Sequence, residues 1–301
     1  MMRSLLFAPG DTPKKLEKAF ASGADAVILD LEDSVAEARK AEARAVTAEF
    51  LASAQRDART PRLIVRVNAL DTGWTDADLA AVVPGRPDAI LLPKASHGAD
   101  LQDVSARIAV LEARFGLADG AVRLHALMTE NARGMLNAAT FAGKTPRLAS
   151  LSWGAEDLAA DIGASANRDE TGAYTDVFRL ARTLTLMAAA DAGVEAIDTV
   201  YTDFRNMEGL ERECRAAVRD GFSGKMAIHP AQVDVINAAF TPPPEDVERA
   251  VRILALFAAA GPDAGVLSLD GRMIDKPHLR QAERVARRAG LDPQNLPRAG
   301  D

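Results

Sequence analysis

The sequence predicts an α/β protein, a (β/α)8 or TIM barrel with a C-terminal helical extension or lid. Eight short apolar runs alternate with segments of helical periodicity. Most of these runs are continuously hydrophobic, as parallel strands buried on both faces are. The chain has 301 residues, a length at which one (β/α)8 unit is common.

The eight predicted strands are bounded mostly by glycine, proline or polar residues. They cover residues 5–9, 26–33, 63–68, 89–94, 124–130, 148–154, 196–202 and 225–230. The segments between the strands have helical periodicity. Between the sixth and seventh strands, Val177, Leu180, Ala181, Leu184 and Ala188 form one clear apolar stripe. Eight alternations predict a closed barrel. The alternative is an open, doubly wound sheet, but the sequence has no GxGxxG turn that would bind a dinucleotide.

The chain divides at a proline-rich break. We expect a catalytic barrel over residues 1–240 and a helical extension over residues 241–301 that contacts a neighbouring subunit. The extension contains a helix around 247–258, a hairpin-like segment that ends at Asp275, and a basic helix over 278–289. It exceeds what a barrel needs, so it acts either as a lid or exchanged arm, or as a passive cover on the barrel.

Composition limits the classes of function. The formal net charge is −7 and no basic stripe occurs, which argues against nucleic acid as a partner. No apolar run is long enough to span a membrane. The only cysteine, Cys214, cannot form an intramolecular disulfide, which fits a reducing compartment. From composition we therefore expect a cytoplasmic protein with neither nucleic acid nor a membrane as its partner.

Polar residues follow nearly every predicted strand at its carboxyl end, where barrel enzymes carry their active sites. They are Asp30, Glu32, Asp33, Arg66, Asn68, Lys94, Glu130, Asp157, Asp203 and His229.

Glu130 and Asp157 follow neighbouring predicted strands, so their carboxylates meet at one rim. Two close carboxylates with no obvious basic partner repel each other unless a cation lies between them. Oxygen ligands of this kind suit Mg²⁺. The alternative is that Glu156 and Asp157 only cap the helix that follows.

With these residues in view, the chain resembles the citrate lyase β-subunit-like family, also called the HpcH/HpaI aldolase and malyl-CoA lyase group. The matching segments include GADAVILDLEDSV (23–35), LLPK (91–94), TENARG (129–134), WGAEDLAADIG (153–163), GFSGKMAIHPAQVDVIN (221–237) and GRMIDKP (271–277). They cover nearly the whole chain in order. The resemblance implies a TIM barrel with Mg²⁺ or Mn²⁺ on Glu130 and Asp157, and chemistry on a CoA thioester.

The resemblance further implies a lyase that cleaves a 3-hydroxyacyl-CoA ester, of the malyl-CoA or citramalyl-CoA type, through an enolate. The products are a short acyl-CoA and a 2-oxo acid. Two alternatives remain open: the β subunit of a citrate lyase, which acts on a citryl thioester of a carrier protein, and a malyl-CoA thioesterase. A non-catalytic barrel is disfavoured because the acidic and basic strand-end residues are all present.

Individual residues receive expected roles. Arg66 donates to the developing oxyanion or pairs with Asp30 or Glu32, or does both. Glu32 accepts hydrogen bonds from water on the metal. By resemblance, Asp275 is the acid–base group and comes from a neighbouring subunit, usually in a homotrimer.

The phosphates of CoA need local cations. We expect Arg3, Lys18 and Lys225 to supply them.

Overall fold

The structure is a computed structural model that describes residues 2–261 and 264–293. In these ranges eight parallel strands form a closed barrel in chain order, with β1 paired to β8. The strands are β1 (Ser4–Pro9), β2 (Ala26–Asp30), β3 (Arg62–Arg66), β4 (Ala89–Leu92), β5 (Arg123–Leu127), β6 (Leu148–Ser152), β7 (Glu195–Asp198) and β8 (Gly224–Ala227). The predicted (β/α)8 barrel is confirmed.

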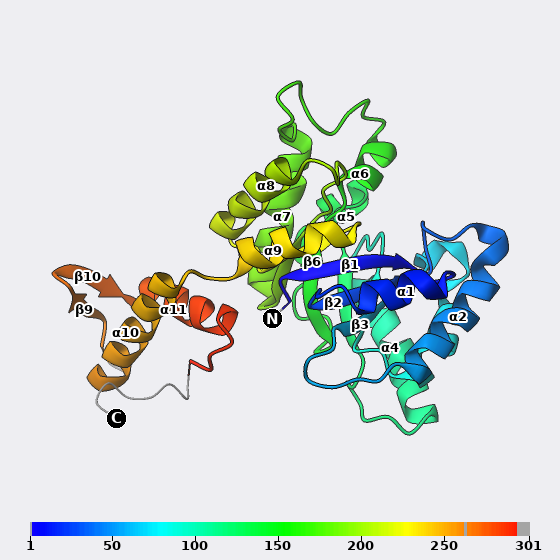
Figure 1. Cartoon of the computed structure of the whole chain (residues 1–301), viewed down its shortest axis with the longest axis horizontal. Helices are drawn as coiled ribbons and strands as arrows, with labels where there is room; N and C mark the ends of the chain where they lie inside the picture. Colours follow the sequence, from blue (N-terminus) through cyan, green and yellow to red (C-terminus); the bar gives the residue numbers. More distant parts are fainter. Residues whose placement is uncertain (1, 262–263, 294–301) are drawn as a thin grey trace. The chain divides into compact units, whose positions relative to one another are not determined.

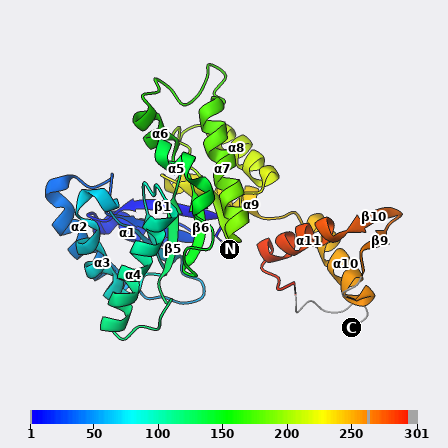
Figure 2. The same cartoon turned by 180° about the vertical axis from the view of Figure 1, so that it is seen from behind.

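Helices follow the strands and lie around the barrel (Figures 1 and 2). They are α1 (Pro13–Phe20), α2 (Lys40–Ser53), α3 (Thr75–Val82), α4 (Gly98–Arg114), α5 (Ala132–Leu136), α6 (Ala155–Ile162), α7 (Asp176–Ala192) and α8 (Met207–Asp220). Helix α9 (Val233–Phe240) comes after β8. All strands except β1 end earlier than predicted. Asp30 and Arg66 are the last residues of β2 and β3, whereas Glu32, Lys94 and Glu130 lie in the turns that follow their strands.

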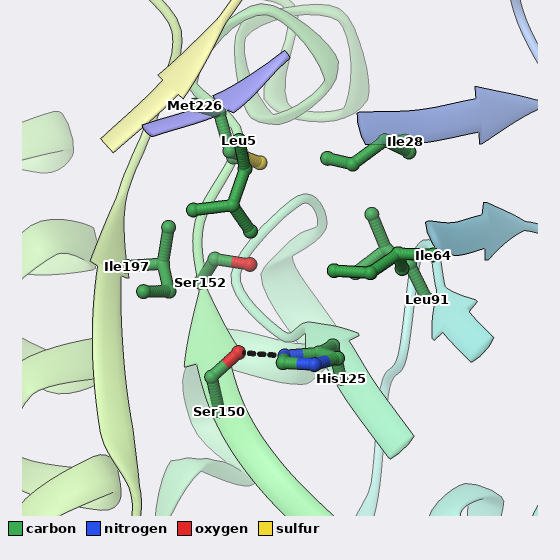
Figure 3. Close-up of a pocket in the computed structure, with 9 residues that line it drawn as sticks. All are labelled: Leu5, Ile28, Ile64, Leu91, His125, Ser150, Ser152, Ile197 and Met226. Carbon is green, nitrogen blue, oxygen red and sulfur yellow. Dashed lines mark hydrogen bonds between the residues drawn. The ribbon is translucent and has the colours of Figure 1, made fainter. Parts of the chain in front are cut away.

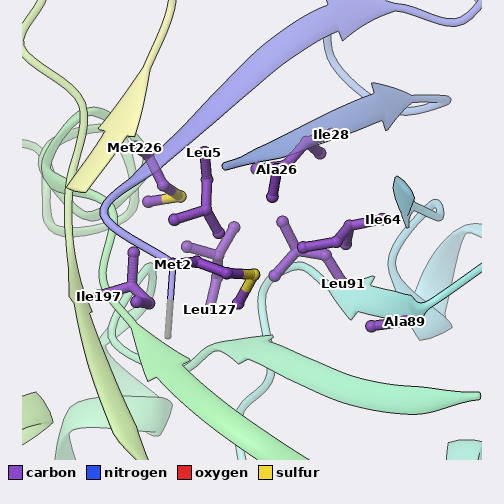
Figure 4. Close-up of a cluster of buried hydrophobic side chains, with 10 residues drawn as sticks. All are labelled: Met2, Leu5, Ala26, Ile28, Ile64, Ala89, Leu91, Leu127, Ile197 and Met226. Atoms are coloured by element: carbon purple, nitrogen blue, oxygen red, sulfur yellow. The ribbon is translucent and has the colours of Figure 1, made fainter. Parts of the chain in front are cut away.

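The barrel interior is filled by one cluster of apolar side chains (Figure 4). Its buried members are Met2, Leu5, Ala26, Ile28, Ile64, Ala89, Leu91, Leu127, Ile197 and Met226. They come from nearly every strand, because alternate residues of each strand point inward. A packed interior leaves the carboxyl-end turns as the place for chemistry.

Helix α7 is present where helical periodicity predicted it, but its buried face overlaps the predicted stripe only in part. Its buried residues are Phe178, Ala181, Thr185, Ala188 and Ala189. Ala181 and Ala188 belong to the predicted stripe, whereas Val177 and Leu180 from that stripe are exposed. The prediction of the helix is confirmed, and the prediction of its buried face is right for these two alanines and wrong for Val177 and Leu180.

Contacts between Cα atoms divide the chain into two compact units after Ile236. The second unit contains α10 (Pro244–Ala260), an antiparallel hairpin of β9 (Val266–Leu269) and β10 (Arg272–Asp275), and α11 (Lys276–Arg288). It has its own apolar core, made of buried side chains of α10, β10 and α11. The hairpin and the two helices are present where the sequence analysis expected them.

No helix among the described residues is both long and apolar enough to cross a membrane.

Candidate active site at the carboxyl ends of the strands

Arg66 and Asp30 form the base of the site. They end β3 and β2 and are register partners in the sheet. The Arg66 guanidinium donates from Nε and from Nη2 to the two carboxylate oxygens of Asp30, each at 2.7 Å. Its Nη1 lies 2.8 Å from Glu32 Oε2, and the guanidinium lies over the Phe7 ring. Both expected salt bridges of Arg66 are therefore present, and they fix the direction of its planar fork.

The Asp30 carboxylate stays ionised in this pairing. Burial alone would raise the pKa of Asp30, but the charge and hydrogen bonds of Arg66 outweigh burial and lower it. Behind this pair, Lys40 Nζ donates to the carbonyl oxygens of Leu31 and Glu32 at 2.7 and 2.8 Å. Lys40 thereby holds the turn that presents Glu32. The sequence analysis did not identify it.

Glu130 comes three residues after β5, and only 3% of it is exposed. Its Oε2 accepts the backbone N–H of Lys94 at 2.7 Å. Gly154, in the turn after the neighbouring strand β6, faces the other oxygen. A Cβ atom on Gly154 would lie 2.6 Å from Glu130 Oε1. The carboxylate therefore occupies a space that only glycine at position 154 leaves open.

Asn131 organises the turn beside Glu130. Its Oδ1 accepts the Gly134 N–H at 2.7 Å and caps α5, and its Nδ2 donates to the Lys94 carbonyl at 3.2 Å. Helix α5 ends at Leu136, and a separate 3₁₀ turn, Ala138–Thr140, follows.

Asp157 lies in the first turn of α6, and its side chain is 30% exposed. No side chain caps α6, so the structure gives no support to the alternative in which Glu156 and Asp157 only cap it. Asp157 Oδ1 lies 3.2 Å from Lys94 Nζ.

The Lys94 ammonium also contacts Glu32 and lies 3.4 Å from Asp33 Oδ2. The assumption that the carboxylates have no basic partner is therefore wrong. Lys94 was recognised only as a strand-end residue.

The site holds more negative than positive charge. Asp30, Glu32, Asp33 and Asp157 contact the cations of Arg66 and Lys94, and Glu130 completes the cluster. Five carboxylates with two cations leave a formal charge of −3 when all are ionised. A divalent cation would reduce that charge to −1.

The pKa values of the two most buried carboxyl groups reflect this excess. Burial raises the pKa of Glu130 to about 8, and the charges of Asp157 and Glu32 add to the effect. Burial also raises the pKa of Glu32 to about 7, against the opposing charges of Arg66 and Lys94. Such carboxyl groups favour a cation nearby.

This donor set fits a divalent cation. The described residues contain no group of three or more His, Cys, Asp or Glu side chains arranged around a metal position. Mg²⁺ does not need one, because it keeps several waters and takes one or two carboxylates plus substrate oxygens. Glu130, in the space left by Gly154, and Asp157 would hold such an ion.

The three cations predicted for CoA are not at this site. Lys225 is fully buried, and its ammonium pairs with Asp198 at 2.9 Å and Glu213 at 2.8 Å. Trp153 also donates to Asp198, at 2.8 Å, and is itself fully buried. A buried, doubly paired ammonium has no face for a ligand, so the prediction for Lys225 is wrong.

Arg3 precedes β1 and pairs with Asp25, which precedes β2, at 2.7 Å. This pair therefore lies at the amino ends of the strands, opposite Glu130. Lys18 is exposed in the last turn of α1, which leads back to those amino ends. The structure does not support a role for either residue in binding a ligand at the carboxyl rim.

Asp275 belongs to the second unit, where it caps α11. Its Oδ1 lies 2.6 Å from His278 Nδ1, and it accepts the His278 N–H at 3.5 Å. The hydrogen bond from His278 lowers the pKa of Asp275, so this carboxyl group is ionised at neutral pH. Its expected role as the acid–base group stays a prediction.

The remaining histidines and the cysteine have structural roles. His125 is buried inside the barrel, where it bonds to Ser150 beside a small cavity lined by apolar side chains (Figure 3). His229 Nδ1 accepts the Ala231 N–H at 3.2 Å, a structural hydrogen bond in the turn after β8. Cys214 is fully buried.

The chain is similar to known proteins over most of its length. A family model described as HpcH/HpaI aldolase/citrate lyase matches residues 3–230. A (3S)-malyl-CoA thioesterase of Cereibacter sphaeroides is 39% identical over 288 residues, which are 95% of this chain and 94% of that protein. The citrate lyase subunit beta of Escherichia coli is 37% identical over 291 residues, 96% of this chain and 93% of that protein.

A solved structure is similar over nearly the whole chain. It is the protein CitE from Mycobacterium tuberculosis in complex with magnesium, acetoacetate and coenzyme A, with a TM-score of 0.75 and 36% sequence identity. The match covers 96% of this chain and 98% of that one. A second structure from the same organism, the citrate lyase beta subunit complexed with oxaloacetate and magnesium, has a TM-score of 0.68 and 37% identity. That match covers 80% of this chain and 97% of the other.

Proposed function

The chain belongs to the HpcH/HpaI aldolase/citrate lyase family, and from this premise we propose that it is a Mg²⁺-dependent carbon–carbon lyase for a 3-hydroxyacyl-CoA ester of the malyl-CoA or citramalyl-CoA type. The observation that carries the proposal is the buried Glu130 carboxylate, which occupies the space left by Gly154 and lies near Asp157. A similar structure that binds magnesium, acetoacetate and coenzyme A supports it.

Glu130 and Asp157 hold the cation in this proposal. When bound, Mg²⁺ or Mn²⁺ supplies Lewis acidity toward the oxygens of the 2-oxo acid. Glu32 lies between Arg66 and Lys94 and accepts hydrogen bonds from water in the site.

Cleavage breaks the bond between the carbon that bears the hydroxyl group and the carbon next to the thioester. The hydroxyl carbon becomes the carbonyl of the 2-oxo acid, and the electron pair passes to the acyl-CoA fragment as an enolate. Arg66 donates to the oxygen on which negative charge develops. Its fork is fixed by Asp30 before the substrate arrives, so little reorganisation is needed.

The hydroxyl group loses a proton when its carbon becomes a carbonyl, and the enolate takes up one proton to become the short acyl-CoA, so cleavage has no net proton change. We assign delivery of the proton to the enolate to Asp275, supplied by a neighbouring subunit of a homotrimer or a multiple of it. As an ionised carboxylate, Asp275 must first accept a proton before it can act as the acid. The carboxylate suits the reverse direction as a base, because it is ionised and its side chain is partly exposed.

The similarity to a malyl-CoA thioesterase favours a second candidate, hydrolysis of the same type of thioester. Product analysis separates the two. Incubate the protein with malyl-CoA or citramalyl-CoA and Mg²⁺, then measure 2-oxo acid, acyl-CoA and free thiol. A lyase gives equal amounts of 2-oxo acid and acyl-CoA without free thiol. A thioesterase gives free CoA and the 3-hydroxy acid.

The same assay tests the metal and the third alternative. Glu130→Gln and Asp157→Asn should each abolish turnover while the far-UV circular dichroism stays unchanged. Full activity after exhaustive chelation would contradict the metal assignment. Cleavage of a carrier-linked citryl thioester, with no cleavage of any CoA ester, would instead favour a citrate lyase β subunit, which the similarity to the Escherichia coli protein suggests.

A further inference from the structure

Lys94 has an unusual backbone for a residue with a side chain. It follows β4 and has a left-handed φ of 52°, a region that L-amino acids other than Gly, Asn and Asp seldom adopt. Two neighbouring groups hold it there. Its N–H donates to Glu130 Oε2, and its carbonyl accepts from Asn131 Nδ2. Because both the N–H and the carbonyl of Lys94 are hydrogen-bonded, this backbone conformation indicates that Lys94 positions neighbouring groups.

The left-handed backbone lets one residue reach both proposed metal ligands. The Lys94 N–H contacts Glu130 at 2.7 Å, and the ammonium lies 3.2 Å from Asp157 Oδ1. The same ammonium contacts Glu32 and lies 3.4 Å from Asp33. Among the residues that the structure describes, Lys94 is the one cation that pairs with Asp157.

These contacts have unequal consequences for a divalent cation. The backbone N–H uses one oxygen of Glu130, and Oε1, on the side of Gly154, has no hydrogen-bond donor in the described contacts. The Lys94 ammonium instead forms an ion pair with Asp157, so it places a positive charge next to this proposed metal ligand. A cation arriving at Asp157 must displace this ammonium or accept its repulsion at close range.

We propose that Lys94 is a positioning residue with two opposed effects: its backbone orients Glu130 for a divalent cation, and its ammonium competes with that cation for Asp157. This inference rests on the proposed metal site. When the cation binds, the ammonium leaves Asp157 and stays with Glu32 and Asp33. Lys94 thus offsets part of the negative charge of the metal-free site and sets the affinity for the metal below what the carboxylates alone would give.

The test measures metal binding rather than turnover. Titrate chelator-treated protein with Mn²⁺ and follow free Mn²⁺ by electron paramagnetic resonance, for the wild type and for Lys94→Met. Methionine keeps an unbranched side chain and the backbone N–H but removes the charge. The variant should bind Mn²⁺ about tenfold more tightly, the lower end of what a neighbouring charge does to the proton affinity of a carboxylate. Lys94→Arg should stay near the wild type.

A matched control removes a nearby charge without the contact. Lys40 lies behind the same turn and donates to carbonyl oxygens, with no contact to Asp157. Lys40→Met should therefore change Mn²⁺ affinity less than Lys94→Met does. Equal gains in the two variants would assign the effect to overall charge and overturn direct competition. Circular dichroism of each metal-free variant checks folding, and Lys94→Gln replaces Lys94→Met if the latter does not fold.

The outcomes distinguish this inference from the proposed function. If the wild type and Lys94→Met both bind no Mn²⁺, or if Glu130→Gln binds it as well as the wild type, the metal assignment itself fails. If the wild type binds Mn²⁺ through Glu130 but Lys94→Met binds it equally or more weakly, competition by the ammonium is refuted and the metal site stands.

Discussion

At the scale of single residues, the missing side chain of Gly154 leaves the space that the Glu130 carboxylate occupies. Gly154→Ala places a Cβ atom 2.6 Å from Glu130 Oε1, and Gly154 has an ordinary negative φ of −130°, so the backbone itself tolerates alanine. The carboxylate must move. We expect Mn²⁺ affinity to fall about ten- to a hundredfold, as when a group that orients a metal ligand is lost.

Calorimetric titration with Mn²⁺ measures this effect. Gly265→Ala is the matched control, because a Cβ atom there meets no atom within 4 Å and the φ of Gly265 is not in the left-handed region. Unchanged affinity in Gly154→Ala would show that the metal does not bind at Glu130.

Arg66 uses three of its nitrogens in the site, Nε and Nη2 on Asp30 and Nη1 on Glu32. Lysine at this position keeps one positive charge but loses the planar fork. We expect Arg66→Lys to lower kcat by about 10²–10³, the size typical of losing one oxyanion donor. Steady-state kinetics on the ester that the protein cleaves measure it.

Arg44→Lys serves as the control, because Arg44 pairs with Asp78 away from the cluster. An unchanged kcat in Arg66→Lys would leave Arg66 with a structural role only.

His125 makes folding stability depend on pH. Burial lowers the pKa of this imidazole from 6.5 to about 3, with smaller effects from Arg62 and Arg123. Between these values the unfolded chain binds one more proton than the folded chain, so stability falls as pH falls from 6.5 toward 3. Between pH 6 and pH 5, this one group should cost about 1 kcal/mol of unfolding free energy.

Urea unfolding at both pH values, for the wild type and His125→Gln, measures the contribution of His125 to the unfolding free energy. Glutamine keeps a hydrogen-bonding partner for Ser150 and does not titrate. The wild type should lose more stability than the variant between pH 6 and pH 5. The same loss in both proteins would mean that another group is responsible.

At the scale of elements, the barrel strands were predictable and the facing of some helices was not. Continuous apolar runs identify strands buried on both sides, and all eight are present. Helix α7 shows the limit of this prediction, because Val177 and Phe178 begin two apolar stripes that share Ala181 and Ala188. The buried face is chosen by partners distant in sequence, such as Thr129, whose hydroxyl contacts Thr185 at 3.2 Å.

The carboxylates of the site and Arg66 could be predicted from one rule, that reactive groups collect at the carboxyl ends of barrel strands. That rule places residues at a rim but does not pair them. The contact of Lys94 with Glu32 joins residues 62 positions apart, and no local pattern indicates it. The prediction for Lys225 was wrong and that for Arg3 is not supported, for a related reason: local sequence does not show which cations already have partners that are buried or at the opposite end of the barrel.

Asp275 is the N-cap residue of α11, so its carboxylate stabilises the start of this helix in addition to its proposed role in catalysis. Asparagine can cap a helix about as well as aspartate, and alanine cannot, at a cost of about 1 kcal/mol. We expect Asp275→Asn to keep the protection of α11 amides in hydrogen-exchange mass spectrometry, and Asp275→Ala to lose part of it. Both variants should lose turnover if Asp275 is the acid–base group. If Asp275→Asn keeps its activity and only Asp275→Ala loses it, activity depends on the helix cap, and the acid–base role of Asp275 is refuted.

At the scale of the whole molecule, we propose that each active site takes Glu130 from one chain and Asp275 from the next. Asp275→Asn and Glu130→Gln proteins should then be inactive alone. Unfolding and refolding them together in equal amounts assorts the chains at random. A working site needs an intact Glu130 and an intact Asp275 on different chains, so about a quarter of wild-type activity should return in a closed ring.

Native mass spectrometry confirms that mixed oligomers form. If they form and the mixture is as inactive as its parents, both residues act within one chain.

The division of the chain after Ile236 has a consequence for recombination between relatives. Residues from Asn237 onward form a compact unit with an apolar core of their own, and the described chain passes into that unit once, within α9. A chimera joined within this helix would replace the whole unit together with the hairpin that leads to Asp275, and would leave every barrel strand intact. The second unit can thus be exchanged as a whole between relatives. A set of such chimeras would show which of the two units determines the choice of acyl group.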